Sequence, residues 1–231
     1  MRNLFYLGWV LLLFSCGKNS GESTIILNGE VKGLKKGTLY LQKVSDTTLV
    51  TIDSLLIQGD GNFRFSVPLE SPEVLYLYLD KKDNNTVNDR ITFFGEAGEM
   101  TINTTWNAFV KDAEIMGSET HKKFEEYRKV MSRFNAKDLE LIRYASNPEA
   151  PLDSLQMDSV QNNRDMNLKR SYAFALNFAL NNKNSAIAPY IAMTEVADAN
   201  KKYLDSIYES LNPEVAASKY GKELKAYLEG I

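Results

Sequence analysis

The stretch TIDSLLIQGDGNFRFSV, residues 51–67, shows how the N-terminal half of this chain of 231 residues is built. Within residues 63–67 phenylalanine and valine alternate with polar residues, which is the period of a strand with one buried face. A strand pattern also covers residues 48–58. The connection GDGN, residues 59–62, predicts a tight hairpin turn, because Asp-Gly tolerates the positive φ that hairpin turns require.

Short runs of the same kind recur on both sides of this stretch. The expected strands are residues 24–31, 38–44, 48–58, 63–67, 75–80, 91–94 and 100–106, with a further edge strand at 109–115. About eight short strands separated by turn residues favour an antiparallel β-sandwich or barrel.

The pattern changes near Gly117, after which glycine becomes scarce and the apolar residues follow helical spacing. Ser118 is the expected cap of the first helix and Ser185 that of a short helix. The remaining expected helices cover residues 151–182, with a buried central segment at 172–180, then 201–211 and 218–228. The predicted fold class is therefore α+β, with an N-terminal antiparallel β-sandwich over residues 24–116 followed by a C-terminal helical bundle over 117–231.

The first residues indicate export. Arg2 precedes an apolar run at residues 4–14, which suits a secretory signal and is too short to span a membrane. The tetrapeptide LFSC, residues 13–16, resembles the bacterial lipoprotein box, in which the cysteine is diacylglycerylated and becomes the new N-terminus. An ordinary signal peptide with an incidental cysteine is the alternative. The expected parts are a lipoprotein signal peptide over 1–15, a lipidated Cys16 and a flexible tether over 16–23.

Residue counts exclude several chemistries. Cys16 is the only cysteine, so the chain alone has no dithiol for redox chemistry and no cysteine cluster for a metal. Removal of Arg2 with the signal leaves 26 basic against 30 acidic residues, which argues against nucleic acid as a partner. We therefore expect no cofactor and no metal.

Two polar features are candidate sites of chemistry. His121 is the only histidine, and we expect it to be an exposed residue of a first helical turn beside Lys122 and Lys123 rather than a catalytic base. The segment 80–89 is rich in oxygen ligands but lacks the ligand order of a helix-loop-helix calcium site. A solvated loop is the favoured interpretation.

Aromatic residues offer a candidate contact surface for a ligand or a partner. Tyr76 and Tyr78 lie on the strand face opposite the leucines, and Trp106 is not far along the sheet order. Such side chains stack on a sugar or clamp a peptide when they are exposed. Burial beneath the helical half or the second sheet is the alternative.

A repeated tripeptide suggests a modification. Asp-Ser-aliphatic recurs four times and resembles the acceptor sequence for O-glycosylation of exported Bacteroidetes proteins. Helix capping by Asp153 and a turn at Asp53 are the alternatives. The candidate acceptors are Ser54, Ser154, Ser159 and Ser206.

The order of three segments carries a family resemblance: LNGEVKGLKKGTLYLQK at 27–43, then residues 51–67, then RITFFGEAGEMTINTTW at 90–106. They resemble the N-terminal domain of unknown function, of the DUF4369 type, that occurs in Bacteroidetes lipoproteins. In fuller members a thioredoxin-like domain with a Cys-x-x-Cys pair follows, as in TlpA- and ResA-like thiol-disulfide oxidoreductases. This chain reaches Ile231 without such a domain.

The sequence thus predicts a non-catalytic lipoprotein that acts as a binding module in the cell envelope. We expect its lipid anchor to lie in the outer membrane on the periplasmic side, and its partner to be an envelope protein or ligand. The alternative implied by the resemblance is an accessory or split N-terminal half of a thiol-disulfide oxidoreductase system, with a thioredoxin-like protein as the partner.

Overall fold

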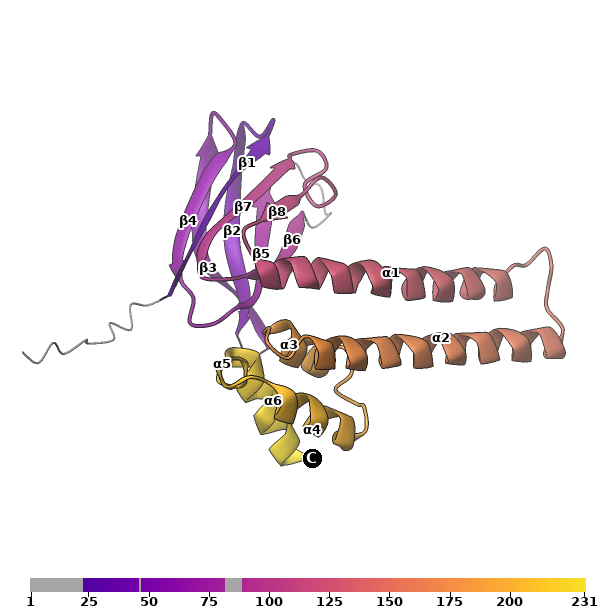
Figure 1. Cartoon of the computed structure of the whole chain (residues 1–231). Coiled ribbons are helices and arrows are strands. Elements are labelled where there is room, and N and C mark those ends of the chain that lie inside the picture. The colour runs from indigo at the N-terminus through magenta and orange to yellow at the C-terminus, as the bar shows by residue number, and fades with distance from the viewer. Residues whose placement is uncertain (1–22, 46, 82–88) are drawn as a thin grey trace, which may run out of the picture.

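The computed structural model describes residues 23–45, 47–81 and 89–231. The predicted signal peptide and Cys16 lie outside the described residues, as does most of the tether. In the part that is described, two sheets form the N-terminal half and helices form the rest (Figure 1). The predicted α+β class is therefore confirmed.

Within the described ranges, eight strands build two four-stranded sheets that pack face to face. The first sheet has the order β4-β1-β7-β8, and the second has the order β3-β2-β5-β6. The sandwich is antiparallel as predicted, except that β1 and β7 run parallel. The strands are β1 (Thr24–Lys32), β2 (Lys36–Ser45), β3 (Thr48–Gln58), β4 (Asn62–Pro68), β5 (Glu73–Asp80), β6 (Arg90–Gly95), β7 (Gly98–Thr105) and β8 (Glu114–Met116).

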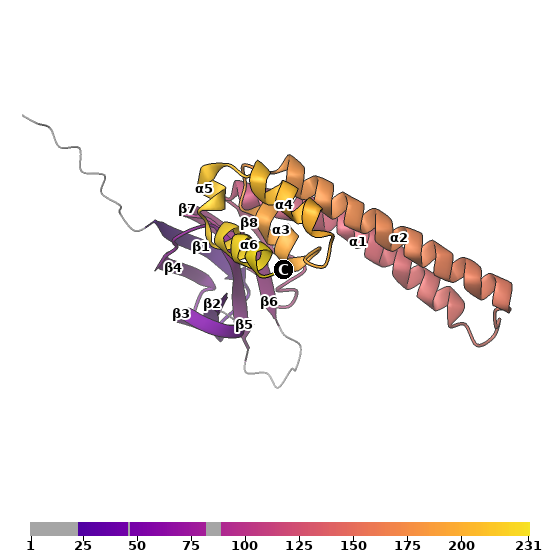
Figure 2. The ribbon, with the colours of Figure 1, turned by 90° about the horizontal axis from the view of Figure 1, so that it is seen from below.

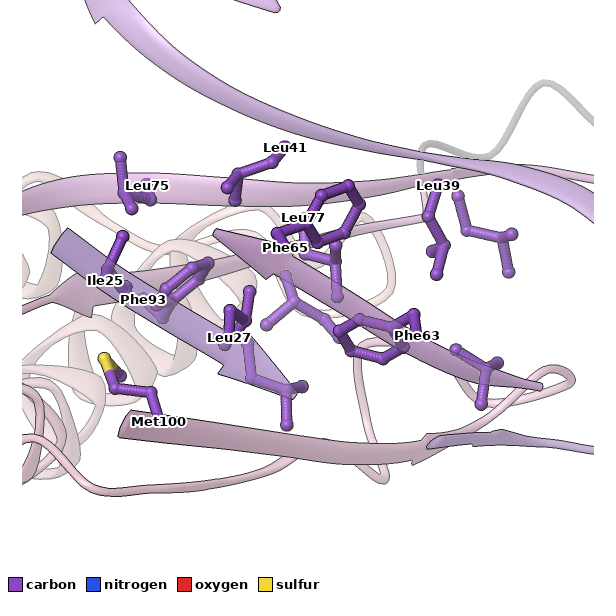
Figure 3. Packing of buried hydrophobic residues seen from close by; sticks show 14 of the residues in the cluster. Ile25, Leu27, Leu39, Leu41, Phe63, Phe65, Leu75, Leu77, Phe93 and Met100 are labelled. Carbon is purple, nitrogen blue, oxygen red and sulfur yellow. The ribbon is translucent and has the colours of Figure 1, made fainter. Parts of the chain in front are cut away.

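The sandwich core comes from the alternation that the sequence shows. Inward residues of both sheets interdigitate, with aromatic rings from β4 and β6 among aliphatic side chains (Figure 3). Burying each large apolar side chain stabilises the fold by about 1.5–3 kcal/mol. The residues labelled in the figure are Ile25, Leu27, Leu39, Leu41, Phe63, Phe65, Leu75, Leu77, Phe93 and Met100.

The GDGN connection does not form the predicted hairpin. β3 and β4 belong to different sheets, so residues 59–61 carry the chain from one sheet to the other. The positive φ falls on Gly59 (117°) rather than on the Asp-Gly pair. Gly61 is required for a different reason, because a Cβ there would lie 2.0 Å from the carbonyl oxygen of Val31, whose N–H donates to the Gly61 carbonyl at 2.8 Å.

The helical half begins with a long antiparallel hairpin that projects well beyond the sheets (Figures 1 and 2). Its helices have 27 and 28 residues, or about 40 Å each at 1.5 Å per residue. Ser118 caps the first as predicted, and Asp153 begins the second with a capping box. The helices are α1 (Glu119–Ala145), α2 (Ser154–Asn181), α3 (Ile187–Thr194), α4 (Lys201–Ser210), α5 (Pro213–Ala216) and α6 (Lys219–Gly230).

Two details of the predicted bundle are wrong. The central buried helix is α3, in which five of eight residues are buried, whereas α2 buries only small side chains, such as Ala175 and Ala179, on one face of the segment 172–180. The reason is that α2 is covered by neighbours on one side and projects into solvent along much of its length. Ser185 does not cap α3, whose N-cap residue is Ala186 and which has no side-chain cap.

Candidate binding groove between sheet edge and helices

An aromatic cluster joins the sandwich to the helices. Phe94 of β6 is fully buried, and its ring lies 5.5–6.1 Å from the rings of Phe124, Tyr190 and Tyr220. The Tyr220 hydroxyl accepts a 3.0 Å hydrogen bond from the main-chain N–H of Val74 in β5. Burial raises the pKa of Tyr220. The helices thus hold one end of the second sheet in a defined position.

Beside this cluster lies a groove of about 990 Å³, which we call the junction groove. One side is the strand β6 together with the segment 110–115 that leads into β8. The other side is α1 from His121 to Asn135, with Tyr190 and Glu195 from the region of α3. Because β6 and β8 are the last strands of their sheets on the same side of the sandwich, the groove follows the edge of the sandwich.

His121 is a structural part of this groove and not the exposed residue that the sequence predicts. The residue is 4 % exposed, and its Nδ1 accepts a 3.2 Å hydrogen bond from the main-chain N–H of Phe94. Its Nε2 lies 3.9 Å from an Oε1 of Glu125. Burial lowers the pKa of His121, a shift that Glu125 opposes, so the imidazole is neutral at pH 7 with its proton on Nε2. His121 therefore closes a sheet edge against α1.

The edge of β6 remains unpaired beyond that contact. In an antiparallel ladder the N–H and C=O of alternate residues point to opposite sides of the strand. The carbonyl of Asp89 accepts from Leu79 of β5, whereas the N–H of Phe94 points away toward α1. Arg90 and Thr92 lie four and two residues before Phe94, so their main-chain N–H and C=O groups also point away from β5. Both residues line the junction groove, and no described residue forms a hydrogen bond with these outward groups.

The groove is positively charged although the chain carries a net charge of −3. Glu125 is paired with Arg128, at 3.3 Å. The other charged lining residues are four cations and two carboxylates, namely Arg90, Lys111, Lys122, Lys129, Glu126 and Glu195.

Two buried polar atoms in the groove lack hydrogen-bond partners among the described residues: the hydroxyl of Tyr127 and Nε of Arg90. Tyr127 is 2 % exposed, and its hydroxyl lies near the Glu195 carboxylate but outside hydrogen-bonding geometry. Burial, reinforced by Glu195, raises the pKa of Tyr127. A ligand that supplies polar atoms here would satisfy groups whose isolation costs about 1–3 kcal/mol each.

The predicted aromatic surface divides between two places. Tyr76 and Tyr78 lie half-buried on the outer face of the second sheet, where the Arg90 guanidinium sits over both rings at 5.9 and 5.3 Å. Tyr78 also stacks on Tyr40, at 5.8 Å. Trp106 is 44 % exposed and lies against Gly33, with the Lys81 Nζ over its ring at 5.5 Å. In the described part of the chain its ring contacts neither tyrosine.

The four candidate acceptor serines are all exposed, which makes them accessible, and their glycosylation stays a prediction. Ser154 follows the helix cap Asp153, as the capping alternative requires. Ser206 donates a 2.8 Å hydrogen bond to the Lys202 carbonyl within α4. Ser54 lies in β3 and Ser159 in α2.

No metal centre is found in the described ranges, where no three His, Cys, Asp or Glu side chains group together. Residues 82–88 of the oxygen-rich loop lie outside those ranges; Lys81 and Asp89, which flank them, form an ion pair of 2.5 Å. None of the helices described is long and apolar enough to cross a membrane.

Sequence reasoning missed the junction groove, because the groove exists only where β6 meets α1 and the segment 110–115. The available signal is His121, three residues after the helix cap Ser118 at the boundary between the two halves. The predicted accessory role beside a thioredoxin-like protein stays a prediction.

Comparison with known protein families gives a match to part of the chain. No curated protein and no solved structure matches the chain significantly. Residues 25–124 match a family model whose description is "Domain of unknown function (DUF4369)". The matched region runs from β1 through the sandwich to Phe124 in α1, so it includes His121 and its contact with the sheet edge. The chain therefore carries, over residues 25–124, a domain of the DUF4369 family.

Proposed function

We propose that this chain is a non-catalytic lipoprotein of the cell envelope that binds a partner protein through the junction groove. The observation that carries the proposal is a net-positive groove along an unpaired strand edge, in a chain whose overall charge is negative. A groove with unsatisfied polar atoms and an excess of positive charge is suited to recognition. The only histidine of the chain, His121, is buried and accepts a hydrogen bond from the main-chain N–H of Phe94, which supports binding rather than catalysis.

The proposed anchor is a lipid on Cys16, which would hold the protein on the periplasmic side of the outer membrane. The lipoprotein-box residues and the short apolar run before them support this part of the proposal. Radiolabelled palmitate incorporated by the wild-type chain and lost in Cys16→Ala is the expected result. Labelling that persists in Cys16→Ala, or that is absent from the wild type, contradicts it.

The groove itself is tested by site-specific photo-crosslinking in intact cells. A photoreactive amino acid placed at Val110, which lines the groove and is 51 % exposed, is expected to capture a defined protein. The same amino acid at Tyr203, 54 % exposed on α4, is the matched control. The adduct should disappear when Lys111→Glu is added to the Val110 variant. Equal capture from both positions, or capture unaffected by Lys111→Glu, refutes the groove as the binding site.

A further inference from the structure

We propose that the junction groove takes an extended, acidic polypeptide segment of the partner, which adds to β6 as a fifth strand of the second sheet. This inference rests on the proposed binding function and specifies the chemistry of the ligand. It follows from three observations, which concern the backbone of β6, the walls of the groove and the charge of its lining.

The backbone provides the template. Arg90 and Thr92 direct their N–H and C=O groups into the groove, and Phe94, the next residue of this phase, is capped by His121. An incoming strand is therefore limited to the part of the edge before Phe94. Four outward groups of two residues accommodate a segment of about three to five residues, since paired residues alternate along the edge. Extended peptides add to free sheet edges in this way in many recognition domains.

The walls receive side chains on both faces of an added strand. Alternate side chains of a strand point to opposite sides, so one set would face α1 and the other the segment 110–115. On the α1 side the lining includes the unpartnered Tyr127 hydroxyl and half-buried Met131. On the other side it includes exposed Val110 and half-buried Ile115. Each wall thus combines apolar area with polar or charged groups.

The charge selects an acidic segment. With Glu125 neutralised by Arg128, the groove keeps four cations against two carboxylates. Arg90 forms no ion pair with a described residue, and its Nε is buried without a hydrogen-bond partner. A guanidinium binds a carboxylate through two parallel hydrogen bonds, whereas a basic segment would be repelled. Arg90 lies on the paired edge itself, so an acidic side chain of the added strand would be within its reach.

The test uses synthetic peptides with the full chain in detergent. The probe is a fluorescent octapeptide, Thr-Glu-Val-Asp-Val-Glu-Val-Thr, followed by fluorescence anisotropy; its counterpart carries lysine in place of the acidic residues. We expect the acidic peptide to bind at least tenfold more tightly than the basic one, and its affinity to fall as salt rises. The absence of acidic-peptide binding up to about 1 mM, or a preference for the basic peptide, overturns the inference.

Strand addition is separated from other modes by N-methylation. Methylating alternate amides removes the donors on one edge of the peptide, so two peptides methylated in opposite phases differ only in which edge is blocked. Pairing with β6 predicts a loss of tenfold or more for one phase and less than threefold for the other, since each main-chain hydrogen bond contributes about 0.5–1.5 kcal/mol. Equal losses in both phases, or none, refute strand addition.

Variants of the chain complete the test. Thr92→Pro removes one outward N–H, a change that edge strands tolerate, and should weaken acidic-peptide binding fivefold or more. Thr92→Val retains the N–H and should leave acidic-peptide binding unchanged. Arg90→Gln should weaken acidic-peptide binding tenfold and reduce the salt dependence of that binding. It replaces Thr92→Pro as the test if circular dichroism shows that Thr92→Pro does not fold. Wild-type affinity in folded Arg90→Gln contradicts the inference. If Val110 captures a protein specifically while the peptides show no phase dependence, the binding function stands and strand addition fails; without specific capture, the binding function fails.

Discussion

Replacing His121 by asparagine tests how the sandwich is joined to the helices. His121 is 4 % exposed, and its imidazole accepts a hydrogen bond from the N–H of Phe94. Desolvation lowers the pKa of His121 below the usual 6.5 despite the nearby carboxylates of Glu125 and Glu96. The unfolded chain takes up a proton at pH 6.5 that the folded chain takes up only at lower pH. The histidine therefore favours unfolding as the pH falls below 6.5, and its stabilising effect is fully present above that value.

The magnitude follows from the same linkage. Between pH 6.5 and the lower pKa of His121 in the folded protein, each decrease of one pH unit reduces the free energy of unfolding by about 1.4 kcal/mol. In His121→Asn the side-chain oxygen replaces Nδ1 as an acceptor but does not titrate. We expect this variant to lose about 1 kcal/mol at pH 7.5, because the smaller side chain packs less well, and to lose the steep dependence between pH 6.5 and 5.5.

The assay is urea denaturation followed by circular dichroism at pH 7.5, 6.5 and 5.5 for both proteins. The difference in stability between wild type and His121→Asn should shrink or change sign as the pH falls. If the two proteins lose stability in parallel over this range, His121 is not a neutral buried group in the folded protein. Parallel loss would assign the pH dependence to carboxylates instead.

Four further outcomes are expected. Gly61→Ala should destabilise the sandwich by more than about 2 kcal/mol in urea denaturation, because its Cβ would meet main-chain atoms at 2.0 Å, whereas Gly230→Ala, with nothing within 4 Å, should be neutral. Tyr220→Phe should cost about 1–2 kcal/mol of unfolding free energy by leaving the N–H of Val74 unpaired; an unchanged denaturation midpoint would contradict that role. Asp153→Ala should cost about 1 kcal/mol and increase amide exchange at the start of α2, and slow exchange there would argue against the cap. Intact mass of the native protein should exceed that of polypeptide plus lipid if the exposed Asp-Ser-aliphatic serines are glycosylated, and a mass equal to that sum ends the idea.

Local periodicity predicted the elements well. Seven of the expected strands are present with small differences at their ends, and β3 begins and ends where its pattern does, at Thr48 and Gln58. The edge strand expected at 109–115 is wrong for most of its length, because residues 109–112 form turns and only β8, Glu114–Met116, is extended. Ser118 accepts from the N–H of His121, as an N-cap side chain must. These features depend on residues that are close in the chain. A helix cap is a hydrogen bond between near neighbours, and the burial of strand residues alternates with the period of their side chains in the sequence.

The partners of each element were less predictable. The GDGN connection has the composition of a hairpin, yet it joins strands of different sheets, since Gly61 serves the close contact with Val31. The apolar segment 172–180 suggested a central helix, but α3 occupies that place. A short apolar run does not specify which neighbours cover it, so its depth of burial depends on elements that are distant in sequence.

By itself the sequence determined the α+β division near Gly117, the alternation of the strands, the Ser118 cap of α1 and the lack of a dithiol. Only the tertiary structure decided that β6 is an edge strand, that His121 closes part of that edge, and that Arg90 and Thr92 face a net-positive groove. The physical reason is the range of the interactions. Caps and alternation are local, whereas an unpaired edge and a groove arise from which strands and helices become neighbours when the chain buries its apolar surface.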